Sequence, residues 1–408
     1  MLVLMRRNDT GMSPHGVPMR PESPLTPAER LHTERVRAHL DAAIAAAGGW
    51  ISFERYMDLA LYAPGLGYYS AGAHKLGMGG DFTTAPEVSR LFGGCVAQQC
   101  AEVLRGLSGG SILELGAGTG RLAIDVLSRL DTLGCLPAHY LILDVSADLR
   151  DRQRRMILEK LPRLAERVMW IDALPAAPLD GVILANEVLD ALPVARFRWG
   201  AAGCEELGVT VVNGGFAWAA QPAPPDMTAA CARLADAPVE RWDDGYVSEY
   251  CPRLVPWAGE VARTLRRGAV LWFDYGLPRP QYYLPERHEG TLLCHFRQRA
   301  LEDPFANPGL QDITAWVDFT AVAEAGCAAD CDLAGFTTQA FFLAGLGIDR
   351  EMHLLAGEDE NCFARLANQA RQLMLPGAMG ERFKAMAWTR ALDHELSGFV
   401  MQDLRHTL

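Results

Sequence analysis

The chain has 408 residues, of which 50% are hydrophobic and 22% are charged. This composition excludes a mostly disordered chain and a fibrous repeat, and the length suits one large domain or two smaller ones. Lys and Arg number 38 against 50 Asp and Glu, so the formal net charge is −12. A field of this sign repels phosphate backbones, so we expect no nucleic-acid ligand. A cationic partner is favoured.

The ten cysteines are spread along the chain, and many lie in apolar runs such as Gly94-Cys95-Val96-Ala97. No Cys-x-x-Cys pair occurs, and Cys327 and Cys331 have no second pair to complete a zinc site. We therefore expect buried thiols in a reducing compartment and no metal. No apolar run approaches the roughly 20 residues that span a bilayer, which predicts no membrane insertion. These features favour the cytoplasm of a bacterial-type cell over the mitochondrial matrix.

The N-terminal part of the chain predicts a tail followed by a lid. Residues 1–24 are rich in proline and lack an apolar period, so we expect a flexible tail. A capping residue and a proline in Leu25–Glu29 predict the start of a helix that runs towards Gly48-Gly49. The stretch from Tyr62 to Glu87 is rich in Gly and Tyr and predicts a long loop over a site. Residues 25–107 thus form an N-terminal helical and loop region.

Short apolar runs then alternate with helical stretches, which is the pattern of a parallel sheet flanked by helices. The runs are Ser111–Leu115, Tyr140–Asp144, Val168–Trp170, Gly181–Ala185 and, after a long interval, Ala269–Asp274. The predicted fold class is α/β with a Rossmann-like sheet.

The long interval divides this core into parts. Residues 108–200 form the first part of a cofactor-binding core, and residues 201–265 form an insertion between core strands 4 and 5 on the substrate side. The insertion contains a predicted hairpin that turns at Asn213-Gly214-Gly215. Residues 266–408 hold the rest of the core, and they end in an antiparallel pair formed by residues 332–343 and 383–389.

A glycine-rich motif, Glu114-Leu115-Gly116-Ala117-Gly118-Thr119-Gly120, follows the first predicted strand. Glycines there let a ligand approach the backbone where side chains would collide. A dinucleotide-binding turn needs a further glycine where Arg121 stands, and no P-loop lysine is present. The spacing instead predicts a nucleoside held through its ribose, with Glu114, Gly116, Gly118 and Gly120 at the site. A tight turn without a ligand is the structural alternative.

Two aspartates follow the next predicted strands. Asp144 ends the second strand, where a carboxylate can accept both ribose hydroxyl protons. Asp172 follows the third strand, where the adenine edge would lie. Either residue has a local alternative, because Asp144 and Ser146 suit a helix cap and Asp172 suits a turn before Pro175.

The fourth predicted strand leads into Asn186, Glu187 and Asp190, and side chains at this end of a parallel strand point into the ligand crevice. If the segment turns helical, Glu187 and Asp190 share a face and can hold one cation. A planar guanidinium fits them because its N–H donors pair bidentately with carboxylates. A capping residue and a solvated acid before Pro193 are the structural alternative.

With these motifs the chain resembles the MidA family of class I S-adenosylmethionine-dependent methyltransferases, which includes the arginine methyltransferase that assists the assembly of mitochondrial complex I. The resemblance covers roughly residues 25–400 and rests, besides the glycine motif, on Gly65–Tyr69, Gly80–Glu87, Asn186–Pro193, Trp272–Gly276 and Asp312–Phe319. Departures from the family occur where Ala117 replaces a common proline, Asp144 a common glutamate and Trp316 a common histidine.

The resemblance implies S-adenosyl-L-methionine as cofactor, with Gly80, Asp81, Phe82, Thr83 and Asn186 in its site. It also implies a protein acceptor with an exposed arginine, which in relatives is a complex I subunit of the 49 kDa type. Thr84 and Glu87 suit a capping box whose helix start would face the carboxylate of the cofactor. Tyr68 and Tyr69 are expected to be core aromatics.

Glu187 and Asp190 are the expected catalytic residues. They would localise the charge of a guanidinium and accept its released proton. Three alternatives remain open: a non-catalytic cofactor-binding assembly factor, a small-molecule methyltransferase and an NAD oxidoreductase. A homodimer is a further expectation for the assembly.

Overall fold

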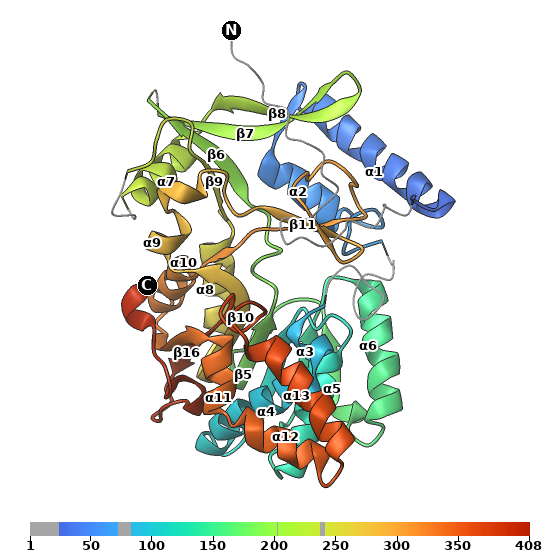
Figure 1. Cartoon of the computed structure of the whole chain (residues 1–408), viewed down its shortest axis with the longest axis vertical. Helices are drawn as coiled ribbons and strands as arrows, with labels where there is room; N and C mark the ends of the chain where they lie inside the picture. The colour runs from blue at the N-terminus through green and yellow to red at the C-terminus, as the bar shows by residue number, and fades with distance from the viewer. Residues whose placement is uncertain (1–23, 72–82, 202, 237–240) are drawn as a thin grey trace.

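The computed structural model describes residues 24–71, 83–201, 203–236 and 241–408. These residues form a lower lobe built on a large sheet and an upper lobe built on two smaller sheets (Figure 1). The predicted tail up to residue 23 lies outside the described residues, as do the predicted site residues Gly80, Asp81 and Phe82.

The sheet of the lower lobe has eight strands. They are β2 Ser111–Leu115, β3 Tyr140–Leu143, β4 Val168–Ile171, β5 Leu179–Asn186, β10 Leu265–Leu277, β14 Val317–Asp318, β15 Asp332–Thr338 and β16 Phe383–Arg390. The order is β15-β16-β10-β5-β2-β3-β4, with β14 paired to β10. The strands from β10 to β4 are parallel to their neighbours, whereas β16 is antiparallel to both β10 and β15.

This sheet confirms the predicted Rossmann-like core. Without β14, numbering its strands along the chain gives the spatial order 3-2-1-4-5-7-6, in which strand 7 is antiparallel. The predicted runs form strands, and the final antiparallel pair is present. Its first arm is shorter than predicted because the hydroxyl of Thr338 caps the next helix, accepting a hydrogen bond from the Phe341 amide at 3.4 Å.

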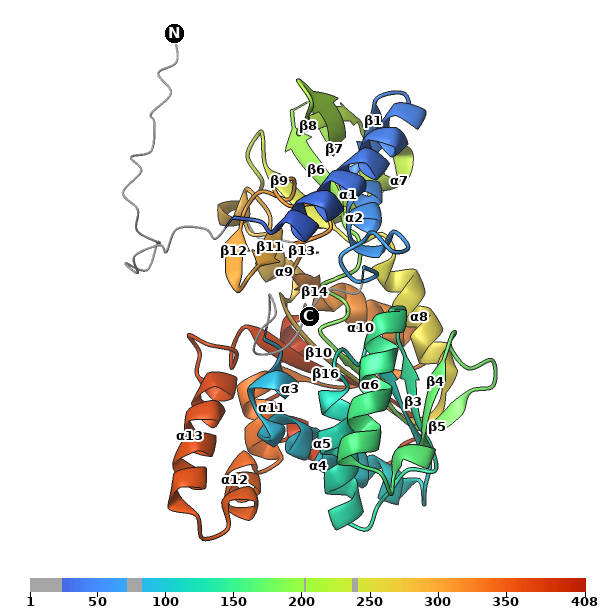
Figure 2. The same ribbon diagram turned by 90° about the vertical axis from the view of Figure 1, so that its right-hand side faces the viewer.

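Helices cover both faces of this sheet (Figure 2). One face carries α4 Arg90–Gly106, α5 Arg121–Thr132, α6 Ala147–Lys160, α11 Gln339–Gly345, α12 Ile348–Ala356 and α13 Glu360–Met374. The other carries α8 Leu254–Thr264 and α10 Phe319–Ala328. Since both faces are buried, the parallel strands read as continuous apolar runs. In β5, for example, Val182 and Leu184 face the first layer, and Ile183 faces the second.

The upper lobe joins the N-terminal region to the insertion. Its larger sheet contains β1 Trp50–Ser52, β6 Ala195–Gly200, β7 Gly203–Val212, β8 Gly215–Pro222 and β9 Val247–Tyr250, in the order β1-β7-β6-β9 with β8 paired to β7. Its smaller sheet contains β11 Leu293–Phe296, β12 Arg299–Leu301 and β13 Asp312–Thr314. Strand β1 lies antiparallel to β7, with Ile51 opposite Val209. The N-terminal region and the insertion therefore share one sheet above the core.

Five further α-helices lie within the described parts of the chain. They are α1 Pro27–Ala46, α2 Phe53–Tyr62, α3 Ala85–Val88, α7 Pro225–Ala235 and α9 Arg279–Tyr282. Helix α1 starts as predicted: Glu29 accepts a hydrogen bond from the Thr26 amide at 2.7 Å, and the Thr26 hydroxyl accepts one from the Glu29 amide at 3.2 Å. None of the helices within the described ranges is long and apolar enough to cross a bilayer.

Two local predictions about the insertion have different outcomes. The β7–β8 hairpin turns at Asn213 and Gly214, whose φ values of +51° and +75° suit the predicted Asn-Gly turn. The expectation of free thiols is wrong for Cys204 and Cys231, which form a disulfide. Packing of α7 against β7 brings their Cα atoms to 6.6 Å, a separation that a disulfide spans.

Candidate active site

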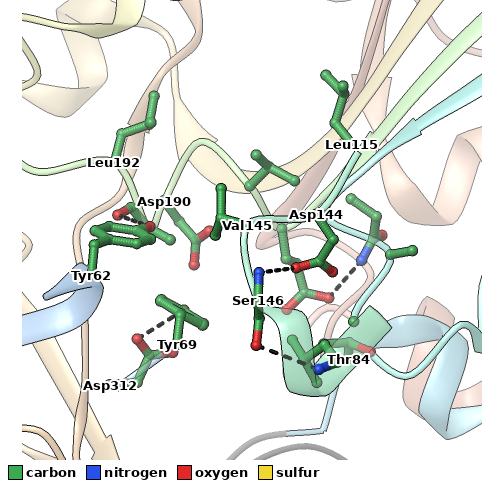
Figure 3. Close-up of a pocket in the computed structure, with 18 of the residues that line it drawn as sticks. Tyr62, Tyr69, Thr84, Leu115, Asp144, Val145, Ser146, Asp190, Leu192 and Asp312 are labelled. Atoms are coloured by element: carbon green, nitrogen blue, oxygen red, sulfur yellow. Dashed lines mark hydrogen bonds between the residues drawn. The ribbon is translucent and has the colours of Figure 1, made fainter. Parts of the chain in front are cut away.

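A cavity of about 760 Å³ lies where the carboxyl ends of β2, β3 and β5 face the upper lobe (Figure 3). Asp144 and Ser146 stand on its core side, and Tyr62, Tyr69 and Asp312 stand opposite. Ligand crevices of parallel sheets form at this edge, and the volume suits a ligand of cofactor size.

The glycine turn after β2 forms the floor of the cavity. Gly116 and Gly118 line it and have φ values of +64° and +54°, which glycine adopts without strain. A Cβ atom on Gly116 would lie 3.1 Å from Cγ2 of Val188. Gly120 does not line the cavity. It is the N-cap residue of α5, and a Cβ atom there would lie 3.3 Å from Cγ of Gln153. Two of the three predicted glycines, Gly116 and Gly118, thus expose their backbone to the cavity, as the binding of a nucleoside requires.

Glu114 lies beside this turn and is buried. Its Oε2 accepts a hydrogen bond from the Tyr140 hydroxyl at 2.8 Å. Burial raises the pKa of Glu114 to about 8, so its neutral form is populated at neutral pH.

Asp144 lines the cavity after β3, as predicted, and is fixed by two hydrogen bonds. Its Oδ1 accepts from the Ser146 amide at 2.9 Å, and its Oδ2 accepts from Nε2 of Gln153 at 2.8 Å. Burial raises the pKa of Asp144. Ser146 caps α6, since its hydroxyl accepts from the Leu149 amide at 3.4 Å. The capping alternative therefore holds for Ser146, and Asp144 still faces the ligand space.

Gln153 was not predicted as a site residue. It is fully buried, and its Nε2 also donates to the Gly118 carbonyl at 2.9 Å. It thus joins the glycine turn to the carboxylate of Asp144. The sequence pattern that could have identified Gln153 is its spacing. Leu149 lies four residues before it and Ile157 four residues after it, which places this polar side chain on the buried face of the helix.

The structure does not bring Asp172 or Thr83 into the cavity. The Asp172 side chain is 89% exposed and pairs with Arg150 at 2.6 Å. Thr83 is half-buried and does not line the cavity, whereas the next residue, Thr84, does.

The predicted capping box of Thr84 and Glu87 is wrong. Thr84 precedes α3 without a side-chain hydrogen bond to it. The Glu87 carboxylate instead accepts a short hydrogen bond from the Thr119 hydroxyl in the glycine turn. This contact engages the carboxylate that a capping box would need, and it ties α3 to the cavity floor.

Glu187 and Asp190 both line the cavity, although the segment between them is a turn and not a helix. Glu187 has a φ of +54°, which is strained for a non-glycine residue. Its Oε1 accepts from Nδ2 of Asn186 at 3.1 Å and from the Ala85 amide at 3.4 Å. Asp190 Oδ2 accepts a short hydrogen bond from the Tyr275 hydroxyl.

One oxygen of each carboxylate has no hydrogen-bond partner among the described residues. These oxygens are Oε2 of Glu187 and Oδ1 of Asp190, and both are buried. Burial and the neighbouring charge of Asp190 raise the pKa of Glu187 well above its usual value, and burial raises the pKa of Asp190 to about 6. Buried carboxylate oxygens are normally paired, so this arrangement predicts a cationic ligand between them.

Tyrosines form the opposite wall, where packing alone was expected for Tyr69. The rings of Tyr62 and Tyr69 stack with centroids 5.4 Å apart. The Tyr69 hydroxyl donates to both oxygens of Asp312 at 2.9 and 3.0 Å, and the Tyr62 hydroxyl donates to the Ala191 carbonyl at 2.9 Å. The wall thus adds a further buried carboxylate to the cavity.

Among the residues that the structure describes, the arginines that line the cavity are already paired. Arg121 contacts Asp125 at 3.0 Å, and Arg253 contacts Glu54 and Asp58 at 2.6 and 2.8 Å. The carboxylates of Glu187 and Asp190 therefore determine the charge at the acceptor end, and that charge favours a cation.

The residues present fit a nucleoside with a sulfonium tail. The exposed glycine backbone and the fixed Asp144 suit an adenosine, and the acidic end next to them suits positive charge. Combined with the strand order of the sheet, this site defines a class I S-adenosyl-L-methionine-dependent methyltransferase.

Comparisons with known proteins support the same class of enzyme. A family model of S-adenosyl-L-methionine-dependent methyltransferases matches residues 95–337, and the chain belongs to this family. The mitochondrial protein arginine methyltransferase NDUFAF7 of Danio rerio is 30% identical over 385 residues, which cover 85% of each chain. That of Rattus norvegicus is also 30% identical, over 88% of this chain and 86% of its own.

A solved structure is similar over nearly the whole chain. It is the crystal structure of a protein from Burkholderia thailandensis that is bound to S-adenosyl-homocysteine. It is 43% identical, its TM-score is 0.90, and the match covers 95% of this chain and 100% of that one. S-adenosyl-L-methionine is thus the cofactor of this enzyme.

Proposed function

We propose that this enzyme transfers methyl groups from S-adenosyl-L-methionine to an arginine side chain of a protein. The observation that carries the proposal is the pair of unpartnered carboxylate oxygens on Glu187 and Asp190. A guanidinium presents N–H donors in a planar fork, so it can satisfy both oxygens at once. The names of the mitochondrial relatives, which are protein arginine methyltransferases, support the same acceptor.

The carboxylates act on the acceptor in two ways. Arginine is protonated in water with a pKa above 12, so a free guanidinium is a poor nucleophile. Glu187 and Asp190 hold the positive charge on two of its nitrogens and leave the third free to attack. The cofactor supplies an electrophilic methyl group on a sulfonium. The attacking nitrogen forms a bond to that methyl carbon, the carbon–sulfur bond breaks, and S-adenosylhomocysteine leaves.

The proton released from the methylated guanidinium passes to Glu187 or Asp190. Both carboxyl groups have raised pKa values, which makes them better bases than solvated carboxylates. The stacked rings of Tyr62 and Tyr69 line this space with aromatic surface. Most of the rate enhancement is then expected from alignment of the nitrogen with the methyl group.

The finer identity of the acceptor is part of the proposal. A subunit of respiratory complex I is the expected acceptor, because the family resemblance of the sequence implies such a subunit. The cytoplasm of a bacterial cell is the expected location, and a homodimer is the expected assembly.

The experiment is methyl transfer from tritiated cofactor to an extract of cells that lack this chain. Acid hydrolysis of the labelled protein should release methylarginine. Label recovered as methyl-lysine, or only in the small-molecule fraction, would contradict the proposal. No label in any fraction, together with tight cofactor binding, would favour a non-catalytic assembly factor.

A further inference from the structure

We infer that Asp274 is a positioning residue that holds the turn carrying Glu187 and Asp190 in its reactive shape. It stands near the end of β10, next to the end of β5. It does not line the cavity, so it acts on the reaction through the turn. The inference rests on the proposed roles of Glu187 and Asp190 but not on the identity of the acceptor.

One oxygen of Asp274 accepts three consecutive backbone hydrogen bonds from the turn. The donors to Oδ2 are the amides of Val188 at 3.2 Å, Leu189 at 2.9 Å and Asp190 at 3.3 Å. These amides have left the ladder of β5 and form no helix, so this carboxylate takes the place of a regular backbone partner.

The other oxygen anchors the carboxylate itself. Asp274 Oδ1 accepts from the Tyr275 amide at 3.0 Å, and the side chain is 1% exposed. Burial and the charges of Asp190 and Glu187 raise the pKa of Asp274, whereas its backbone hydrogen bonds favour the ionised form. A third carboxylate is costly beside two others, so its presence here calls for a specific role.

The turn is also held from its other side. The Asp190 carbonyl accepts from the Ala315 amide at 3.1 Å, and the Ala191 carbonyl accepts from the Tyr62 hydroxyl at 2.9 Å. Amides of the turn therefore face the core sheet, and carbonyls face the upper lobe. Between these contacts Glu187 keeps its strained φ of +54°, which persists only where the surroundings impose it.

The substitution Asp274→Asn tests this role. An amide retains one acceptor oxygen but places an NH2 group where the second oxygen was, so either the three turn amides or the Tyr275 amide lose their acceptor. The turn should therefore become mobile.

Three measurements separate positioning from general stability. Hydrogen exchange should be at least about 10-fold faster for the amides of residues 188–190 in the variant, because in one orientation of the new amide they lose their acceptor and in the other a neutral oxygen replaces the carboxylate oxygen. Affinity for S-adenosylhomocysteine, by calorimetry, should stay within about threefold. The kcat for methyl transfer to extract protein should fall about 100-fold, as expected for a misplaced reactive group.

The matched control is Asp180→Asn. Asp180 pairs on the surface with Arg266 at 2.8 Å and does not line the cavity. It should change none of the three measurements. Asp274→Glu keeps the charge and both acceptor oxygens, so it should restore protection of the turn in part and recover about a tenth of kcat.

Unchanged exchange of the three amides, or a kcat within twofold of wild type, in Asp274→Asn would overturn the inference. If circular dichroism shows that this variant is unfolded, Asp274→Glu decides, and full kcat with a carboxylate moved by one methylene would overturn it equally. If the wild type methylates no protein, the proposed function fails, and the exchange measurement alone decides whether Asp274 holds the turn.

Discussion

The hydroxyl of Tyr275 donates a hydrogen bond to Oδ2 of Asp190, and both side chains are buried. The bond favours the ionised carboxylate and therefore opposes the effect of burial, which raises the pKa of Asp190 to about 6. It also leaves Oδ1 of Asp190 as the oxygen that faces a ligand. Tyr275 thus sets both the orientation and the charge of a proposed catalytic group.

Removal of that hydroxyl should change the pH dependence of methyl transfer. In Tyr275→Phe, Asp190 loses a donor to its ionised form, so its pKa should rise above about 6. Activity that requires the carboxylate falls as the pH drops through this pKa, so the acid limb should move to higher pH.

The control for Tyr275→Phe is Tyr283→Phe, which removes a buried hydroxyl that donates to the Glu249 carbonyl at 3.1 Å, outside the cavity. Its acid limb should match that of the wild type. An acid limb that stays in place in Tyr275→Phe would show that Asp190 does not titrate in the rate-limiting step.

Two glycine substitutions should separate the effect of backbone strain on stability from the effect of lost space on cofactor binding. Gly116→Ala places a Cβ atom 3.1 Å from Val188 at a φ of +64°. Gly134→Ala imposes a similar φ of +62° with no heavy atom within 4 Å. Each variant should lose about 1–2 kcal/mol of unfolding free energy from the left-handed backbone. Only Gly116→Ala should also weaken S-adenosylhomocysteine binding, by at least about 10-fold in calorimetry. Equal affinities in the two variants would remove the turn from the cofactor site.

Asp144 should be required for cofactor affinity. Asp144→Asn places an NH2 group against one of its two donors, Gln153 or the Ser146 amide, and removes an acceptor for the ribose. Affinity for S-adenosylhomocysteine should fall about 10- to 100-fold, as expected for the loss of charge-assisted hydrogen bonds. Asp151→Asn, at an exposed aspartate of α6 paired with Arg154, is the control. Wild-type affinity in Asp144→Asn would contradict the role of Asp144 in cofactor binding. The same titration with Asp172→Asn tests the prediction that Asp172 contacts the adenine edge.

Glu114 should make folding stability depend on pH. Its pKa is about 8 in the folded protein against 4.5 when exposed, so the folded state binds the extra proton between these values. The free energy of unfolding should therefore decrease as the pH rises from 5 to 8. In Glu114→Gln this dependence is absent. The stability of the variant relative to wild type should then improve with pH, by on the order of 3 kcal/mol over this range. Urea denaturation at several pH values measures the difference, and a difference that does not change with pH would contradict the assignment.

Much of the core could be predicted from the sequence because its signals are local. Apolar runs such as Ser111–Leu115 are short and bounded by turn residues, and an Asn-Gly pair specifies its hairpin. The positions of Asp144 and Glu187 follow from the rule that carboxyl ends of parallel strands meet at one edge. These are the residues that the structure brings to the cavity.

The remaining features depend on contacts between distant segments. Strand β1 pairs with β7 across some 160 residues, so no local pattern joins the N-terminal region to the insertion. The capping box failed because Thr119, which is remote in sequence, engages Glu87. The role of Asp274 depends on a turn that lies 84 to 86 residues earlier in the chain. Asp172 follows the edge strand β4, where its carboxylate is exposed and pairs with Arg150.

The most direct test of the account is the amount of methylarginine formed by the wild type and by Asp190→Asn under identical conditions. Both proteins receive tritiated S-adenosyl-L-methionine and the same extract protein, and hydrolysed products are separated by chromatography. We predict labelled methylarginine with the wild type and a loss of at least about 100-fold with Asp190→Asn, at unchanged affinity for S-adenosylhomocysteine. Equal amounts of methylarginine from both proteins, or label on a different residue, would contradict the account.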